Sequence, residues 1–489
     1  MSSMDSGDAV PLIHTAKLKC EQRSVRAVKR FLVGLIVVLC GLNAGAEKPN
    51  IIFINVDDLG VMDVDYNSDR YLTPNLRRLC SVGMVYSEAY AAASESAPSR
   101  ASVMSGQYPA RHGIYTDASS GAGLSKDRKL VPIKSETFLP LENVTLAEAL
   151  KKGGYKTVHL GKWNIGEDPT KQGFDVNIGG DASGSPKGGY FVPFTEGPMV
   201  EYNEDYEEGT HMVDVLTDQA LKYMKIHEEE PFFMSLNFYS VHTPLVAVPW
   251  LVGQHDASVV NPKYASMVQM VDAGIGRILD AVYTLGLRNN TIIVFTSDNG
   301  GVKKISDQTP FRSGKGSYFD GGLRVPLVIS WHGKTAKAGL CEVPVSGIDF
   351  YPTFLEIAGL KVPEGKVLDG VSLVPLFKKR GKIEDRPLFW HFPFYIESVN
   401  GKADDGYDEK FLTRPGTTVR MGRWKLHEYY EDGRIELYDL GADPIERMNF
   451  KHINVRTAER LHNALKEWRE KIGAPIPTEL NPEYVPSAK

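Results

Sequence analysis

Short apolar runs alternate with helical patterns along most of this chain, and this alternation constrains the fold more than any other feature. Apolar strand-length runs separated by helix-length segments indicate a mostly parallel sheet whose crossovers are helices. Polar clusters follow directly where several of these runs end, and open α/β sheets bind their ligands at that carboxyl edge. We therefore predict an α/β fold with a large mixed, mostly parallel sheet sandwiched by helices. The expected strands include Ile51–Val56, Lys156–Leu160, Phe232–Phe238 and Thr291–Thr296.

Towards the C-terminus the pattern changes to that of a smaller α+β unit. Trp424–Tyr430 and Ile435–Leu440 alternate in polarity around Asp432-Gly433, which predicts a β-hairpin and hence an antiparallel sheet. An amphipathic helical pattern follows the hairpin. We expect a catalytic domain over residues 47–375 and a C-terminal α+β subdomain over residues 376–489.

The N-terminal residues 1–46 are typical of an export signal with a long basic n-region. Lysines and arginines precede the apolar run Phe31–Leu42, and the small residues Ala44-Gly45-Ala46 follow it. The run is too short to cross a bilayer as a helix, so no membrane span is expected in the mature chain. A lipid anchor at Cys40 or an uncleaved leader remains an alternative. Export is the prediction.

The charge balance limits the class of partner. A net charge of −5 at pH 7 provides no basic surface of the kind that nucleic-acid binding requires. Nucleic acid is therefore not expected as the main partner, although a local basic pocket for a small anion is compatible with this balance.

Two acidic pairs follow predicted strands, and their side chains suit a metal ion. Asp57-Asp58 and Asp298-Asn299 offer three carboxylates and one amide, all of them oxygen donors. Such ligands suit a hard cation such as Ca²⁺ or Mg²⁺, and no Cys or His cluster has the spacing of a zinc site. Each pair taken alone would more often be a solvated turn or a helix cap.

The segment Ser96-Ala-Pro-Ser-Arg100 is the second candidate for chemistry. Pro98 suits the first turn of a helix, so Ser96 is expected at a helix N-terminus. Free backbone N–H groups and the helix dipole favour an anion there, and Arg100 adds a planar donor fork for a tetrahedral oxyanion. A capped helix with a salt-bridged arginine would explain the same residues without any catalysis.

At this point the sequence resembles a known family. Ser96-Ala-Pro-Ser-Arg100, with Ser105-Gly106 downstream, resembles the signature of type I sulfatases, in which a Cys or Ser is oxidised to formylglycine. The resemblance implies an alkaline-phosphatase-like fold and runs through most of the chain. The other matching segments, in order, are Asn50–Gly60, Gly161–Trp163, Gly173–Asp175, His242–Pro244, Thr296–Gly300, Gly314–Gly316 with Asp320–Pro326, and Leu437–Leu440 with Asp443-Pro444.

The resemblance implies a role for each matching residue. Oxidised and hydrated, Ser96 would be the nucleophile, and Arg100 would hold it in place. Lys162 and Lys315 would bind the sulfate, and His242 would lie beside the leaving-group oxygen. The calcium ligands implied by the resemblance are Asp57, Asp58, Asp298 and Asn299.

The sequence departs from the family pattern at Asn164, where the family usually has a histidine two residues after the first lysine. Asparagine can bind by hydrogen bonds but cannot exchange protons at neutral pH, so Asn164 predicts either that another group replaces the histidine or that sulfate release is slow. A hydrogen bond from Asn164 to a particular substrate is the further alternative. The serine at position 96 implies, again by resemblance, a radical iron–sulfur maturase found chiefly in bacteria. With the leader, this predicts a bacterial periplasm, a cell surface or secretion.

The sequence says less about the carrier of the sulfate. By resemblance we expect a sulfated carbohydrate rather than an aryl sulfate. The aromatic stretch Phe389–Tyr395 is expected either to stack on sugar rings or to pack between the two domains, with His391 and Arg414 as candidate rim contacts. A phosphodiesterase or phosphonate hydrolase of the same superfamily remains an alternative. So does an inactive glycan-binding protein in which Ser96 stays serine.

Overall fold

The computed structural model describes residues 48–256 and 260–486, so the predicted leader over residues 1–46 lies outside the described residues. The chain from Lys48 to Lys489 forms one compact unit, and the domain boundary expected near residue 376 stays a prediction. Among the residues that the structure describes, every helix is too short or too polar to cross a bilayer.

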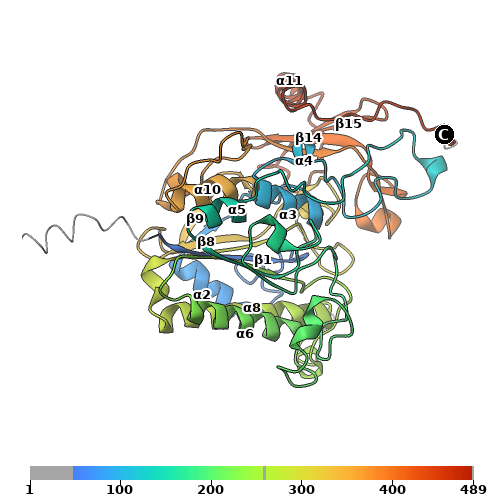
Figure 1. Ribbon diagram of the computed structural model, residues 1–489. Helices are drawn as coiled ribbons and strands as arrows, with labels where there is room; N and C mark the ends of the chain where they lie inside the picture. Colours follow the sequence, from blue (N-terminus) through green and yellow to red (C-terminus); the bar gives the residue numbers. More distant parts are fainter. Residues whose placement is uncertain (1–47, 257–259, 487–489) are drawn as a thin grey trace, which may run out of the picture. The chain divides into compact units, whose positions relative to one another are not determined.

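An eight-stranded sheet in the order β5-β4-β6-β1-β7-β8-β2-β9 forms the centre of this unit (Figure 1). Adjacent strands of this sheet are parallel, except that β8 runs antiparallel to both β7 and β2. The predicted mixed, mostly parallel sheet is therefore confirmed. The strands are β1 (Asn50–Val56), β2 (Met84–Tyr86), β4 (Lys156–Gly161), β5 (Val176–Ile178), β6 (Phe232–Phe238), β7 (Thr291–Ser297), β8 (Leu327–Trp331) and β9 (Gly339–Cys341).

Helices cover both faces of this sheet because its central strands are apolar on both sides. On β1, Ile52 and Ile54 pack into a core with one layer of helices, whereas Ile51 and Phe53 pack into a second core with the other layer. Figure 1 shows the two layers on opposite sides of the sheet. The first layer contains α2 (Pro74–Val82), α6 (Met212–Ile226) and α8 (Pro262–Thr284), and the second contains α3 (Ser96–Ser105), α5 (Leu146–Lys152) and α10 (Phe350–Ile357).

Local signals position several of these helices. Helix α5 begins with a capping box, in which Thr145 and Glu148 each bind the other's backbone N–H. Helix α3 begins at Ser96, as predicted, and ends at Gly106, whose φ of 67° suits glycine in the left-handed region. The short helices are α4 (Pro109–His112), α7 (Pro249–Val252) and α9 (Asp320–Leu323).

A four-stranded antiparallel sheet in the order β11-β14-β15-β16 forms the C-terminal part, as predicted. The expected hairpin is β15 paired with β16, and α11 (Val455–Ile472) follows it and packs Leu461, Leu465 and Trp468 into one core with that sheet. The strands are β11 (Leu388–Phe392), β14 (Gly416–Met421), β15 (Trp424–Tyr429) and β16 (Ile435–Asp439). Two short ladders pair β3 (Ala89–Tyr90) with β10 (Val345–Ser346) and β12 (Ile396–Glu397) with β13 (Phe411–Thr413).

Candidate active site

The acidic residues that follow β1 and β7 meet at the carboxyl edge of the sheet. These strands are parallel neighbours in register, with Val56 opposite Ser297, so the residues after them lie side by side. One oxygen from each of Asp57, Asp58 and Asp298 lies within 4.8 Å of the others, and all three side chains are buried. Asn299 joins them, and its Nδ2 donates to Asp58 Oδ1 at 2.8 Å.

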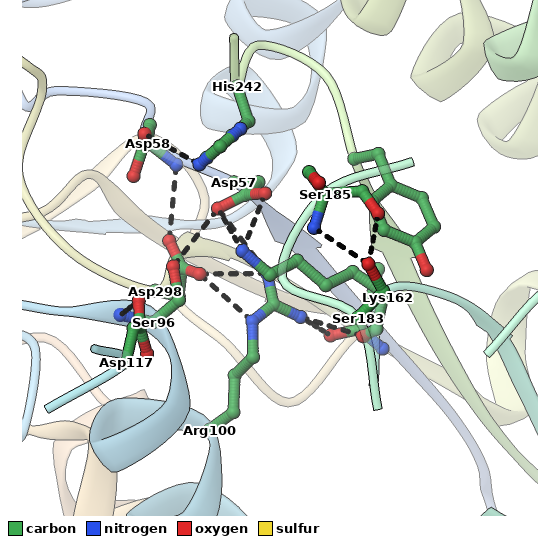
Figure 2. A network of polar contacts seen from close by, with 12 residues as sticks. Asp57, Asp58, Ser96, Arg100, Asp117, Lys162, Ser183, Ser185, His242 and Asp298 are labelled. Atoms are coloured by element: carbon green, nitrogen blue, oxygen red, sulfur yellow. Dashed lines mark hydrogen bonds and ion pairs between the residues drawn. The ribbon is translucent and has the colours of Figure 1, made fainter. Parts of the chain in front are cut away.

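Three basic side chains lie against this acidic cluster, and Figure 2 shows two of them, Arg100 and Lys162. Lys162, just after β4, donates to both carboxylate oxygens of Asp57 at 3.0 and 2.8 Å. Arg100 of α3 donates from Nε to Asp298 Oδ2 at 2.9 Å. Lys315 lies 2.7 Å from Asp58 Oδ1. Three carboxylates therefore balance three cations in a buried site.

This balance shows in the protonation of the carboxyls. Burial raises the pKa of Asp57 to about 6, with Lys162 opposing that rise and Asp298 adding to it. Burial alone would raise the pKa of Asp298 as well, but the cations of Arg100 and Lys162 hold it below its usual range. A divalent cation would favour the ionised form of all three carboxyls. The donor set, three carboxylates and an amide oxygen, fits such an ion.

Ser96 lies where α3 meets the acidic cluster. Its Oγ is 3.2 Å from Asp57 Oδ1 and 3.2 Å from Asn299 Oδ1. The backbone N–H groups at the start of α3 are bound by Asp117, whose carboxylate accepts from Ser96 N at 3.1 Å and from Ala97 N. The N-terminus of α3 thus binds an anion, as predicted, and this anion is the carboxylate of Asp117 from the same chain.

His242 lies next to the cluster on the segment after β6. Its Nε2 is 3.8 Å from Asp58 Oδ2, and its Nδ1 is 2.6 Å from the Thr243 carbonyl oxygen. The ring is partly exposed, with 19% of the side chain accessible. An incoming molecule could therefore reach Nε2.

Asn164 follows Lys162 by two residues, and its backbone has a φ of 59°, in the left-handed region that asparagine tolerates. Its backbone N–H donates to the Asp181 carbonyl oxygen at 3.0 Å. Its side-chain Nδ2 is buried and has no hydrogen-bond partner among the residues that the structure describes. This amide is therefore available as a donor.

The polar contacts that the structure gives for His391 and Arg414 are with residues outside the acidic cluster. His391 is buried on β11, with Nδ1 bound to Thr417 and Nε2 to the Pro475 carbonyl oxygen, and burial lowers the pKa of its ring to about 4. Arg414 pairs with Asp408 and Glu431, both at 2.7 Å. The aromatic residues around His391 are buried as well, which favours packing over stacking on sugar rings for this stretch.

Three residues near the cluster were not predicted from the sequence. Asn237 near the end of β6 accepts a hydrogen bond from Arg100 Nη1 at 3.0 Å, and its place as a polar residue near a strand end was a usable signal. Asp117 caps α3 from a loop, where no local pattern marks it. Glu95 stands directly before Ser96; burial raises the pKa of its carboxyl to about 7, and the nearby Asp117 carboxylate adds to the rise.

Comparison with known proteins defines the class. The sulfatase family's sequence model matches residues 49–360, and that of the N-sulphoglucosamine sulphohydrolase C-terminal region matches residues 314–471. A sulfatase of Formosa agariphila is 29% identical, covering 88% of this chain and 90% of that protein. N-acetylgalactosamine-6-sulfatase of Mus musculus is 30% identical, covering 87% of this chain and 81% of that protein.

Solved structures agree with these sequence matches. Ps i-CgsB in complex with k-i-k-neocarrahexaose is 27% identical with a TM-score of 0.70, covering 89% of this chain and 95% of that chain. The phosphonate monoester hydrolase of Agrobacterium radiobacter, at 20% identity and a TM-score of 0.63, covers 87% of this chain and 96% of that chain and shares the fold. The protein is thus an enzyme with an alkaline-phosphatase-like fold. It belongs to the sulfatase family.

Proposed function

We propose that this protein is a sulfuric ester hydrolase that removes sulfate from a sulfated carbohydrate, using a formylglycine derived from Ser96 and one Ca²⁺ ion. The observation that carries the proposal is the position of Ser96 Oγ, 3.2 Å from Asp57 and Asn299 at the first turn of α3. The proposed nucleophile therefore lies in direct contact with two of the proposed metal ligands in a buried site. The carbohydrate part is supported by the names of the relatives, an N-acetylgalactosamine-6-sulfatase and a protein bound to a neocarrahexaose.

The residues around Ser96 suit attack on a sulfate ester. The hydrate of formylglycine supplies two hydroxyls on one carbon, one to attack sulfur and the other to release sulfate as the aldehyde re-forms. Lys162 and Lys315 bind the equatorial sulfate oxygens and stabilise the charge that develops on them. Arg100 holds the start of α3 against Asp298, and His242 Nε2 faces the leaving-group oxygen.

The charges of the site's side chains support the proposal that it holds a divalent cation. Asp57, Asp58, Asp298 and Asn299 would hold Ca²⁺, a hard ion that takes oxygen ligands, and it would supply Lewis-acid stabilisation. Asp57, Asp58 and Asp298 already balance Arg100 and the two lysines, so the ion would add two positive charges to this cluster, beside the Asp117 carboxylate. A sulfate ester is an anion and would be attracted to that charge.

We also propose that Ser96 is converted by a radical-type maturase and that the protein is exported to a bacterial periplasm, a cell surface or the medium. The serine at position 96 supports the maturase, and the basic and apolar N-terminal sequence supports export.

The proposed function is tested by desulfation of defined substrates. Converted, calcium-loaded protein is incubated with N-acetylgalactosamine 6-sulfate, glucosamine 6-sulfate, carrageenan oligosaccharides, 4-nitrophenyl sulfate and bis(4-nitrophenyl) phosphate. We expect sulfate release, measured by ion chromatography, to be fastest from a carbohydrate. Preference for the aryl sulfate would make the protein an arylsulfatase. Turnover of only the phosphodiester would contradict the proposal, as would no turnover despite verified conversion of Ser96.

Replacing Asn164 with histidine tests why the family pattern changes at this position. Histidine also adopts the left-handed backbone region, so Asn164→His should fold. If Asn164 marks a missing proton-transfer group, then sulfate release limits the rate, because such a group typically contributes about 10²–10⁴-fold. We expect kcat to rise several-fold with kcat/KM little changed.

Pre-steady-state kinetics provide the decisive measurement for Asn164. We expect a burst of desulfated product from the present enzyme and no burst from Asn164→His. A fall in kcat/KM without any burst would show instead that the free Nδ2 binds substrate. Asn164→Gln, which keeps an amide, is the matched control for side-chain size.

A further inference from the structure

The residue directly before the nucleophile, Glu95, lines a pocket that opens beside the catalytic lysine Lys315. This pocket has a volume of about 350 Å³ and also reaches Thr243, the residue after His242. The sulfate-binding lysine and the residue after His242 therefore line the same pocket. The pocket is the space next to the reacting sulfate.

The carboxyl group of Glu95 is bound by the Thr116 side chain and by the Asp117 backbone, but one of its two oxygens keeps no partner among the described residues. Glu95 is the N-cap residue of α3, but its side chain does not cap the helix. Asp117 binds the free N–H groups at this terminus instead. The Oε2 atom of Glu95 is buried and has no hydrogen-bond partner in the described part of the chain.

Lys315 does not neutralise Glu95 by a direct ion pair. The ammonium group of Lys315 is bound to Asp58 Oδ1 at 2.7 Å. A buried carboxyl oxygen without a partner is costly, and such atoms in native proteins usually have a partner that the bound state supplies. The unsatisfied atom of Glu95 therefore points to a hydrogen-bond donor on the ligand.

The rest of the pocket suits a sugar ring. One wall is aliphatic and half-buried and can lie against the C–H face of a ring, and lysines at the rim can meet further anionic groups of a chain. The aliphatic residues are Val302, Ile305, Ile396 and Leu412, the lysines are Lys303 and Lys304, and the acidic residues Glu397 and Asp404 also line the pocket. A volume of about 350 Å³ is at the lower end of the range for small-ligand pockets, which suits one ring rather than several.

We propose that Glu95 accepts a hydrogen bond from a free hydroxyl of the sugar that carries the reacting sulfate. A carboxyl oxygen of Glu95 can accept this hydrogen bond in either protonation state, and the ionised form also repels a second sulfate or a carboxylate at the same place. Glu95 thereby selects sugars whose position next to the reacting sulfate is unsulfated. This inference rests on the proposed function, because the sulfated sugar is the substrate proposed above.

A double-mutant cycle between enzyme and substrate tests the contact. The substrate is the monosulfated sugar that the wild type desulfates fastest, paired with its deoxy analogue lacking the hydroxyl nearest the sulfate. For N-acetylgalactosamine 6-sulfate this is the 4-deoxy analogue. We expect wild-type kcat/KM to be about 10- to 100-fold lower for the deoxy analogue, the usual worth of a hydrogen bond to a charged group. Glu95→Ala should lower kcat/KM for the parent sugar to a similar extent and abolish the preference.

Further substrates separate recognition from damage to the site. The disulfated sugar carries a sulfate in place of that hydroxyl. The ratio of kcat/KM for the disulfated sugar to kcat/KM for the monosulfated sugar should be higher in both Glu95→Gln and Glu95→Ala than in the wild type. Turnover of 4-nitrophenyl sulfate, which lacks the hydroxyl, should change less than about threefold in Glu95→Gln. Glu459→Gln, at an exposed position on α11, is the control and should match the wild type on every substrate.

Two outcomes would overturn this inference. Equal losses on the sugar and on the aryl sulfate would show that Glu95 supports the nucleophile or the fold instead. An unchanged preference for the hydroxyl in Glu95→Ala would show that another residue binds it. Neither outcome affects the proposed function, which instead fails if the wild type releases sulfate from no sulfated sugar.

Discussion

Protein produced without a maturase, with Ser96 left as serine, is expected to release sulfate on the order of 10⁴-fold more slowly than converted protein, or slower still. A serine hydroxyl is a weak nucleophile unless a base removes its proton. The carboxylate within reach of Ser96 Oγ is Asp57, which Lys162 already binds and which the proposed metal would occupy. A sulfate ester formed on serine would also lack the second hydroxyl that expels sulfate.

Loss of activity should occur without loss of the fold. In the unconverted protein, Ser96 has hydrogen bonds to Asp57 and Asn299. The melting temperature of the unconverted protein should therefore equal that of the converted protein. Mass spectrometry of the Ser96 peptide measures conversion as the loss of a pair of hydrogen atoms. Ser102→Ala, a buried serine on the same helix that leaves the signature intact, is the control and should retain activity. Rapid turnover by a preparation containing only serine at position 96 would exclude the formylglycine mechanism.

Much of the fold followed from local patterns, because the strands of this sheet are apolar on both faces. The strand expected over Phe232–Phe238 is present with the predicted bounds. On α8, the apolar residues Met267, Val271 and Ile275 recur at a helical spacing and are all buried. The hairpin and the amphipathic helix of the C-terminal part were equally clear in the sequence. Such elements are determined by residues close together in the chain.

Parts of the site depend instead on contacts between distant segments, which no local pattern specifies. Asp117 lies in a loop 21 residues after Ser96, and only the fold brings its carboxylate to Ser96 N. His391 shows the converse. Its aromatic surroundings suggested a pocket rim as well as a core, and the structure places it on a strand with every residue buried. The sequence pattern of an aromatic strand does not separate these two environments.

The second large effect expected is on the metal, which Asp298→Ala should remove together with activity. Asp298 binds two other parts of the site: its carboxylate accepts from Arg100 Nε at 2.9 Å and from the backbone N–H of Asp58 at 3.2 Å. Without it, the buried guanidinium of Arg100 loses its closest counter-charge and repels a cation. We expect a loss of activity on the order of 10³-fold, since Lewis-acid stabilisation is worth several kcal/mol.

Elemental analysis and calorimetry measure this effect directly on the converted protein. The wild type should contain one Ca²⁺ ion per chain, and Asp298→Ala should contain little. Asp298→Asn, which keeps an oxygen donor but removes a charge, should lie between them. Asp307→Ala, at a side chain that is 56% exposed, should bind calcium as the wild type does. Stoichiometric zinc, or fully active protein without metal, would contradict the calcium assignment.

The pH dependence of calcium binding gives an independent test of the same site. Burial raises the pKa of Asp57 to about 6 in the metal-free protein, so this carboxyl holds a proton below that pH. A metal ligand must be deprotonated, and therefore calcium and the proton compete. Calcium affinity should be nearly constant above about pH 7 and should fall progressively as the pH drops through 6, with proton release on binding in that range. Calorimetry in buffers of different ionisation enthalpy measures the protons released. An affinity that rises on acidification would show that Asp57 does not bind the ion.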